Sequence, residues 1–175
     1  HFVPELKVVG WRNLEEVEER LAGLHPVIMI ANHLSHADAP VLTSAIKREG
    51  FDEIANKLVF LLGIRMKNTP FLNKILDSYS YIPVWPPTII PKDQKENAES
   101  LGMAKRAITA SRENLKRGNI LVMFPEGGRS RNGQLSTVKR VMAHYMLDTS
   151  DANIAPVGIV GSERVLPVGD FLPKR

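Results

Sequence analysis

Residues 27–40 read VIMIANHLSHADAP and join a continuous apolar run to a polar loop and then to a second regular element. The apolar run 27–31 has the length and composition of a strand that is buried on both faces. Upstream, His25-Pro26 ends a helix, because a residue that precedes proline is pushed out of helical geometry. Downstream, Pro40 suits the first turn of a helix that we expect over Ala39–Lys47. This order of elements is typical of an α/β protein.

The rest of the chain continues the alternation of strands and helices. Apolar runs predict strands, and apolar residues spaced by three or four positions predict helices. The expected strands are Lys57–Ile64, Tyr79–Trp85, Ile120–Phe124 and Ile154–Val160, and the expected helices are Asn13–Leu24, Pro70–Leu76, Asn97–Arg117 and Thr137–Leu147. Strands that alternate with helices imply a mostly parallel central sheet covered by helices, so the predicted fold class is α/β.

The longest predicted helix, Asn97–Arg117, has a basic outer face and an apolar face that we expect to meet the core. Gly118 is the expected stop signal, because glycine adopts the left-handed conformation that commonly ends helices. The residues placed on the core face are Leu101, Ala104, Ile108 and Leu115.

Composition limits the classes of protein to which the chain can belong. The 175 residues are 43% hydrophobic and 24% charged, which suits one globular domain with a real core. The net charge of +4 suits a phosphate-bearing substrate or an anionic membrane surface, and with 6% aromatic residues it does not argue for nucleic acid. The absence of cysteine excludes a disulfide scaffold, a Cys-ligated zinc site and a thiol nucleophile. No apolar run approaches the roughly 18 residues of a membrane span.

We expect a single domain over residues 1–175. The sequence begins with His1 rather than Met and ends abruptly at Lys174-Arg175, so we also expect that it is trimmed at both ends. An N-terminal anchor or helical bundle is a candidate for a missing part.

Two polar loops follow predicted strands at the sheet edge where ligands bind in α/β proteins. In the first, Asn32–Asp38, His33 precedes Asp38 by five positions. A neutral imidazole can take the proton of a hydroxyl, and a carboxylate on its other ring nitrogen fixes the tautomer and stabilises the imidazolium. The plainer alternative makes Asp38 a helix cap before Ala39-Pro40 and His33 a polar loop residue. The loop alone leaves both open.

No other nucleophile is obvious, because the chain has no cysteine and no Gly-x-Ser-x-Gly elbow. The pair would therefore activate a hydroxyl of the substrate. A metal site is a third interpretation, because His33, His36 and Asp38 cluster like hydrolase ligands. The spacing disfavours it, since a His-x-His-x-Asp-His constellation needs another histidine where this chain has Ala39. We therefore expect no metal.

The second loop reads Phe124-Pro-Glu-Gly-Gly-Arg-Ser-Arg131. Its two adjacent glycines let the backbone approach a ligand closely, and the two arginines that flank Ser130 are fork-shaped donors suited to phosphate. It is not a P-loop, because no Gly-Lys-Ser/Thr follows. The plainer alternative is a solvated basic turn in which Glu126 pairs with an arginine.

Together the two loops resemble the glycerolipid acyltransferase family, which includes glycerol-3-phosphate and lysophospholipid acyltransferases. Residues 124–130 match the ordered string Phe-Pro-Glu-Gly-x-Arg-Ser, and a chance match is on the order of one in a hundred thousand. The family's first block, Asn-His-x-x-x-x-Asp, is matched by Asn32, His33 and Asp38. The resemblance runs from about His25 to Arg164 and implies the fold of a glycerol-3-phosphate acyltransferase.

The resemblance also implies roles for individual residues. His33 is the implied catalytic base and Asp38 its partner. The third block implies a turn that holds the phosphate-bearing acceptor, with Gly128 standing where threonine is more usual. The fourth block, an apolar strand with a central proline, resembles 154–159 and is expected to line the acyl side. The substrate-binding residues implied by the third block are Glu126, Gly127, Gly128, Arg129, Ser130 and Arg131.

The second block departs from the family pattern. The family ends a strand here with an arginine that contacts the acceptor phosphate, but after Tyr81-Ile-Pro-Val84 this chain has Trp85-Pro-Pro87. Lys92 is the nearest downstream cation, and Arg65 or Lys139 could also supply the charge. Otherwise the acceptor differs.

The resemblance implies transfer of a fatty acyl group from acyl-CoA or acyl carrier protein to glycerol-3-phosphate or a lysophospholipid such as lysophosphatidate, with no cofactor. Backbone N–H groups near Gly127-Gly128 are candidates for stabilising the oxyanion. Gly127–Arg131 and Gly63–Met66 resemble the soluble glycerol-3-phosphate branch, whereas the Phe-Pro-Glu form is more usual in the lysophospholipid branch. We expect a cytoplasmic protein, either free or peripheral at an anionic membrane surface, with acyl carrier protein as a further candidate partner.

Two alternatives from other classes remain. One is a metal-dependent phosphoester hydrolase that uses His33, His36 and Asp38. The other is a non-catalytic lipid-phosphate-binding module, a degenerate relative that lost the arginine of the second block.

Overall fold

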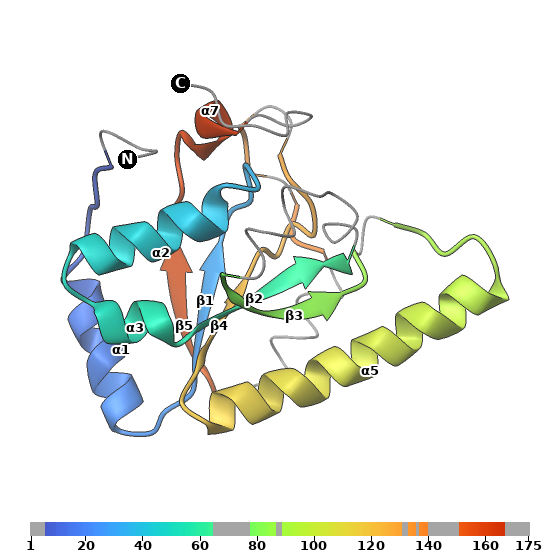
Figure 1. Ribbon diagram of the computed structural model, residues 1–175, viewed down its shortest axis with the longest axis horizontal. Helices are drawn as coiled ribbons and strands as arrows, with labels where there is room; N and C mark the ends of the chain where they lie inside the picture. The colour runs from blue at the N-terminus through green and yellow to red at the C-terminus, as the bar shows by residue number, and fades with distance from the viewer. Residues whose placement is uncertain are drawn as a thin grey trace.

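A five-stranded parallel sheet forms the centre of the protein (Figure 1). The computed structural model describes residues 6–64, 78–86, 89–130, 133–135, 137–139 and 151–166. The strand order over these ranges is β3-β2-β4-β1-β5, with every neighbouring pair parallel. The strands are β1 (Val27–Ala31), β2 (Leu58–Gly63), β3 (Ser80–Val84), β4 (Ile120–Met123) and β5 (Asn153–Val157). The predicted α/β fold class is confirmed.

Helices cover both faces of this sheet (Figure 1). The helices are α1 (Asn13–Ala22), α2 (Asp38–Arg48), α3 (Asp52–Asn56), α5 (Gln94–Lys116) and α7 (Ser162–Val165). The first three pack on one face and α5 packs on the other. The sequence did not predict α3 or α7, because helices of 5 and 4 residues are too short to show a helical period.

The interior strand β1, which lies between β4 and β5, has a continuously apolar sequence because both of its faces are covered. Val27 and Met29 belong to the core beneath α1–α3, whereas Ile28 belongs to the core beneath α5. Successive side chains of a strand point to opposite faces, so a strand covered on both sides needs no polar position. All three side chains are at most 1% exposed. Burial of each stabilises the fold by about 1.5–3 kcal/mol.

The strand register aligns the ends of β1, β4 and β5. Ile30 of β1 lies opposite Met123 of β4 and opposite Pro156 of β5. Because these strands are parallel, the chain leaves all three at the same edge of the sheet. The segments that begin at residues 32, 124 and 158 therefore start side by side.

The long helix α5 begins earlier than expected and ends where expected. The Asp93 side chain caps the helix by accepting a hydrogen bond of 2.8 Å from the backbone N–H of Glu96, so the helix starts at Gln94, three residues ahead of the predicted start. Gly118 has φ +77°, the left-handed conformation that favours glycine, directly after the last turn.

The predicted core face of α5 is partly wrong. The buried residues are Met103, Ala107, Ser111 and Leu115, whereas Leu101 is 58% exposed, Ala104 is exposed and Ile108 is half-buried. The spacing of four between buried residues defines the stripe that meets the sheet. The buried serine concealed this stripe from a search for apolar positions. The N-terminal part of α5 extends past the strands in Figure 1.

Two other predicted helices are not established. Residues 137–139 are not helical, so a helix starting at Thr137 is wrong, and the rest of the expected Thr137–Leu147 helix lies outside the described residues. The expected helix Pro70–Leu76 lies outside them entirely. Within the part of the chain that the structure describes, no helix is both long enough and apolar enough to span a bilayer.

Candidate active site

His33 and Asp38 form a close pair in the loop that follows β1. The Nδ1 atom of His33 lies 2.7 Å from Oδ2 of Asp38, whose side chain has no solvent exposure. The same Oδ2 accepts hydrogen bonds from the backbone N–H groups of Leu34 (2.8 Å) and Ser35 (3.0 Å). Asp38 is the first residue of α2, and the cap position is Ala37, with no side-chain cap hydrogen bond. The plain interpretation of Asp38 as a helix cap is therefore wrong.

The contact with Asp38 fixes the orientation of the His33 ring. An ionised carboxylate only accepts hydrogen bonds, so Nδ1 carries the proton and Nε2 keeps its lone pair. The ring also stacks on Phe124, with centroids 4.3 Å apart and planes inclined by 21°. With a side chain that is 15% exposed, His33 is held on two sides and can present Nε2 to a substrate.

The loop after β4 holds the backbone of His33 at both ends. The Oε1 atom of Glu126 accepts a hydrogen bond of 2.7 Å from the N–H of His33. The carbonyl of His33 accepts one of 2.7 Å from the N–H of Ser130. Glu126 is 2% exposed and Ser130 is 6% exposed, so both lie under the surface. Burial of these two side chains contradicts the plainer interpretation that the turn is solvated, whereas a pairing of Glu126 with an arginine stays a prediction.

The segment after β5 contributes a third set of contacts, which the sequence did not reveal. The amide of Asn32 pairs reciprocally with the backbone of Ile159, at 2.8 and 2.6 Å. The hydroxyl of Ser162 donates to Oδ1 of Asp38, 124 residues away in the chain. No motif marks Ser162, and only the strand order brings it to the loop after β1.

Two basic side chains lie in the electrostatic field of the pair. Burial lowers the pKa of the half-buried Arg129, and the charge of Asp38 opposes this shift. Burial lowers the pKa of His36 to about 4, the charges of Arg129 and His33 lower it further, and Asp38 opposes them. His36 is therefore neutral at pH 7. Its buried Nδ1 has no hydrogen-bond partner among the described residues.

Within the predicted phosphate-binding turn, one backbone N–H is hydrogen-bonded inside the turn, and two residues are partly exposed at its surface. Gly127 has φ +71°, and its N–H donates to the carbonyl of Phe124 at 3.0 Å, so this N–H is already used within the turn. Gly128 and Arg129 are half-buried at the surface of the turn. Arg131 lies outside the described residues.

Trp85 and Pro86 follow β3 at the point where the second block of the family has its arginine. The indole N–H of Trp85 donates to the carbonyl of Ile89 at 3.0 Å. Pro86 lies against Gly63, where an added Cβ would come within 2.9 Å of its ring. The described contacts at this end of β3 are therefore the Trp85 hydrogen bond and the packing of Pro86 on Gly63.

The three candidate replacement cations have different positions. The backbone N–H of Lys139 donates to the carbonyl of Pro125 at 2.9 Å, so the structure brings Lys139 to the loop after β4. Lys92 is exposed and lies just before α5, whose N-terminal end is far from the top of β1 in Figure 1. The structure does not bring Lys92 to the His33 loop. Arg65 lies outside the described residues.

Over the described ranges, no group of three or more His, Asp or Glu side chains is arranged to hold a metal ion. His33, His36 and Asp38 do not form such a group, because Asp38 directs its oxygens to the His33 ring, to backbone N–H groups and to Ser162. No observation therefore favours the hydrolase alternative.

Comparison with known proteins decides the family. The family model described as Acyltransferase matches residues 6–160, which include the loops after β1 and β4 and the first residues of the segment after β5. The chain belongs to the acyltransferase family. The resemblance to glycerolipid acyltransferases is thereby confirmed.

Two plant relatives and one solved structure are similar to this chain. The glycerol-3-phosphate acyltransferase of Pisum sativum chloroplasts is 29% identical over 121 residues, covering 66% of this chain and 25% of that protein. The 1-acyl-sn-glycerol-3-phosphate acyltransferase LPAT1 of Arabidopsis thaliana chloroplasts is 25% identical over 157 residues, covering 90% of this chain and 38% of that protein. This chain therefore spans well under half the length of either relative.

The similar structure is the 1-acyl-sn-glycerophosphate acyltransferase PlsC of Thermotoga maritima. It superposes with a TM-score of 0.51 at 20% identity, covering 91% of this chain and 61% of that one. At this identity the match establishes the fold alone.

The depressed pKa of His36 makes stability depend on pH. An ordinary histidine has a pKa of 6.5, so between pH 6.5 and about 4 the unfolded state binds a proton that the folded state does not. The contribution of His36 to the free energy of unfolding is therefore fully present above pH 6.5, and up to about 3 kcal/mol of it is lost as the pH drops to 4.

We expect His36→Gln to reduce this loss, measured as the free energy of unfolding in urea between pH 7 and 4.5. His25→Gln removes an exposed histidine and is the matched control. An acid loss as steep in His36→Gln as in the unsubstituted protein would contradict the assignment.

Proposed function

We propose that this acyltransferase moves a fatty acyl group from a thioester, carried by coenzyme A or acyl carrier protein, to a hydroxyl of glycerol-3-phosphate or of a lysophospholipid such as lysophosphatidate, as a step of phospholipid synthesis. The observation that carries the proposal is the 2.7 Å contact between His33 and the buried Asp38, beside the half-buried Arg129. The base, its orienting carboxylate and a cation for the acceptor phosphate lie in two adjoining loops.

The proposed reaction begins with proton transfer to His33. Nε2 takes the proton of the acceptor hydroxyl as its oxygen attacks the thioester carbonyl carbon, giving a tetrahedral oxyanion. The carbon–sulfur bond then breaks, and the thiolate takes the proton back from the imidazolium. The charge of Asp38 stabilises the imidazolium between the two steps, and general base catalysis of this kind contributes about 10²–10⁴ in rate.

The acceptor is proposed to bind through its phosphate. Arg129 presents a guanidinium fork that suits two phosphate oxygens. Its low exposure strengthens the attraction, because charges interact more strongly away from bulk water. Lys139, which is tied to Pro125, is the proposed second cation in place of the arginine that the second block lacks. The turn at Gly127-Gly128 then brings the acceptor close to the backbone.

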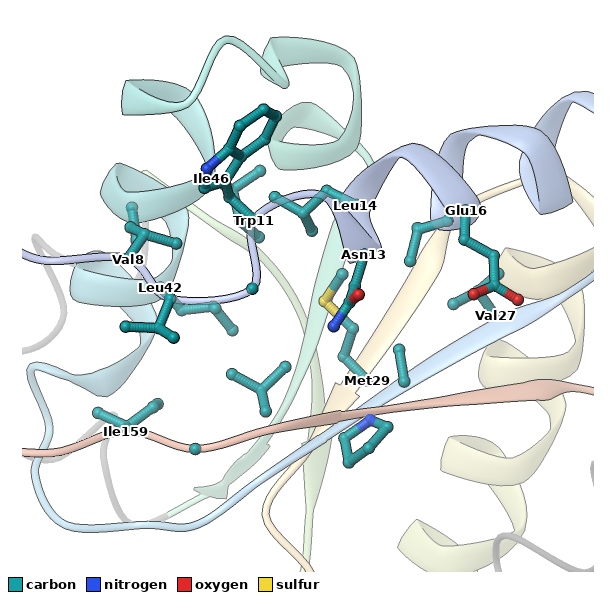
Figure 2. A pocket seen from close by; sticks show the side chains of 18 of the residues that line it. Val8, Trp11, Asn13, Leu14, Glu16, Val27, Met29, Leu42, Ile46 and Ile159 are labelled. Atoms are coloured by element: carbon teal, nitrogen blue, oxygen red, sulfur yellow. The ribbon is translucent and has the colours of Figure 1, made fainter.

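A cavity of about 570 Å³ supports the proposed binding of the acyl chain (Figure 2). It lies between α1, α2, β1 and β5, and the apolar side chains of Met29, Leu42 and Ile46 line it. Ile159 also lines it and is hydrogen-bonded to Asn32, the neighbour of the proposed base. The volume falls in the range of pockets for ligands of this size. The fourth block, expected to line the acyl side, forms one wall of this cavity.

The first test is the release of free thiol from acyl-CoA and from acyl carrier protein, with and without glycerol-3-phosphate or lysophosphatidate. The protein contributes no thiol of its own, because it has no cysteine. We expect release that depends on one acceptor, and we expect Arg129→Ala to raise the KM for that acceptor about tenfold or more, because a charge-assisted hydrogen bond to phosphate is lost. Lys139→Ala should raise the same KM, and Lys92→Ala is the charge-matched comparison.

The outcomes of this assay separate the candidate functions. Release that depends on the acceptor supports the proposal and names the substrate. An equal rise of KM in Lys92→Ala would show a general effect of charge and would contradict a specific site at Arg129. Acceptor binding with no thiol release from either donor would contradict acyl transfer and favour the lipid-phosphate-binding module.

The second test concerns the length of the acyl chain. Ala45 lines the cavity from α2, and we expect Ala45→Phe to fill part of the cavity and shift preference toward shorter acyl donors. The measurement is kcat/KM across donors of increasing chain length. Ser44→Phe adds the same ring at the exposed neighbouring position and is the matched control. An unchanged preference in Ala45→Phe would place the acyl chain elsewhere.

A further inference from the structure

We propose that Ser162 is a positioning residue of the His33–Asp38 pair, whose hydroxyl holds the second carboxylate oxygen of Asp38 and so sets the strength of the proton acceptor that faces His33. The inference rests on the proposed function, in which His33 is the base. Ser162 lies outside both loops that carry the family motifs.

The two oxygens of Asp38 have different surroundings. Oδ2 is shared by Nδ1 of His33 and the backbone N–H groups of Leu34 and Ser35. For Oδ1, the hydroxyl of Ser162 is the donor within the described part of the chain. Asp38 is 0% exposed and Ser162 is 2% exposed, so bulk water cannot replace this donor. A buried charge needs such partners, because its desolvation is otherwise costly.

Contacts on both sides of Ser162 fix its position. Before it, Ile159 pairs with Asn32 through two hydrogen bonds. After it, the carbonyl of Leu166 accepts a hydrogen bond of 2.7 Å from the hydroxyl of Ser35. Between them the chain turns at Gly161, where φ is +87°. The segment 159–166 is therefore attached to the His33 loop at three points, and the middle one touches the carboxylate.

The proton affinity of His33 depends on how many hydrogen-bond donors stabilise the negative charge of Asp38. A donor on Oδ1 stabilises the ionised carboxylate and weakens its attraction for the proton on His33. Without that donor the pair holds a proton more tightly, so a larger fraction of His33 is protonated and cannot act as a base. Loss of the Ser162 hydroxyl should therefore move the acid limb of the pH–rate profile to higher pH.

Other charged and titratable groups also face the pair. His36 comes from the same loop, Arg129 and Glu126 come from the loop after β4, and Glu163 is the neighbour of Ser162 in α7. None of these residues is substituted in a Ser162 variant. A difference between variants in the titration of His33 therefore reports on the hydroxyl.

The test compares Ser162→Ala with Ser162→Thr and with Ser111→Ala. The readouts are the NMR titration of the His33 ring, assigned with His33→Gln, and the pH dependence of kcat/KM. In Ser162→Ala we expect both midpoints to move up by about 0.5–1 pH unit, which on the acid limb is a three- to tenfold loss of rate. Ser162→Thr keeps the hydroxyl and should restore both. Ser111→Ala removes another buried hydroxyl, from α5 on the other face of the sheet, and should leave both midpoints unmoved.

An unmoved His33 titration in Ser162→Ala, or an equal shift in Ser111→Ala, would overturn the proposal. If Ser162→Ala does not fold, Ser162→Cys makes the same comparison, because a thiol is only a weak donor. The NMR titration needs no turnover. A protein that transfers no acyl group but shows the His33 shift therefore contradicts the proposed function and supports the role of Ser162.

Discussion

The burial of the Asp38 carboxylate is the constraint on which the rest of the site depends. A charge with no solvent contact is tolerated only if donors surround it. Asp38 obtains them from the His33 ring, from two backbone N–H groups of its own loop and from Ser162. The first turn of α2 adds a favourable field, because a helix N-terminus attracts negative charge. The geometry of His33 follows from this arrangement, since the ring is one of the donors.

The sheet order explains how three distant segments can meet this requirement. β1 lies between β4 and β5, so the loops that follow these three strands leave from one edge side by side. The loop after β4 holds the backbone of His33 through Glu126 and Ser130, and the segment after β5 holds Asn32 and Asp38 through Ile159 and Ser162. The fold thus fixes the proposed base from both sides. This rigidity is what proton transfer to a positioned base requires.

Sequence patterns predicted the parts of the site whose partners are close in the chain. His33 and Asp38 are five positions apart, and a strand buried on both faces is visible in residues 27–31. The individual contacts between distant segments could not be predicted. The sequence placed the loop of Glu126 at the same sheet edge as His33, but not the hydrogen bond between two residues 93 positions apart, and no motif marked Ser162, which is 124 residues from Asp38. The error in α5 has a different cause, because the buried Ser111 carries no apolar signal.

The most direct test of the account is the acceptor-dependent thiol release of His33→Ala beside the unsubstituted protein. His33 is the proposed proton acceptor, so we expect a loss of about 10²–10⁴ in kcat. The circular dichroism spectrum and the melting transition should remain those of a folded protein, because the sheet and both cores do not depend on the ring. A folded His33→Ala protein that transfers acyl groups at a comparable rate would contradict the assignment of His33 as the base.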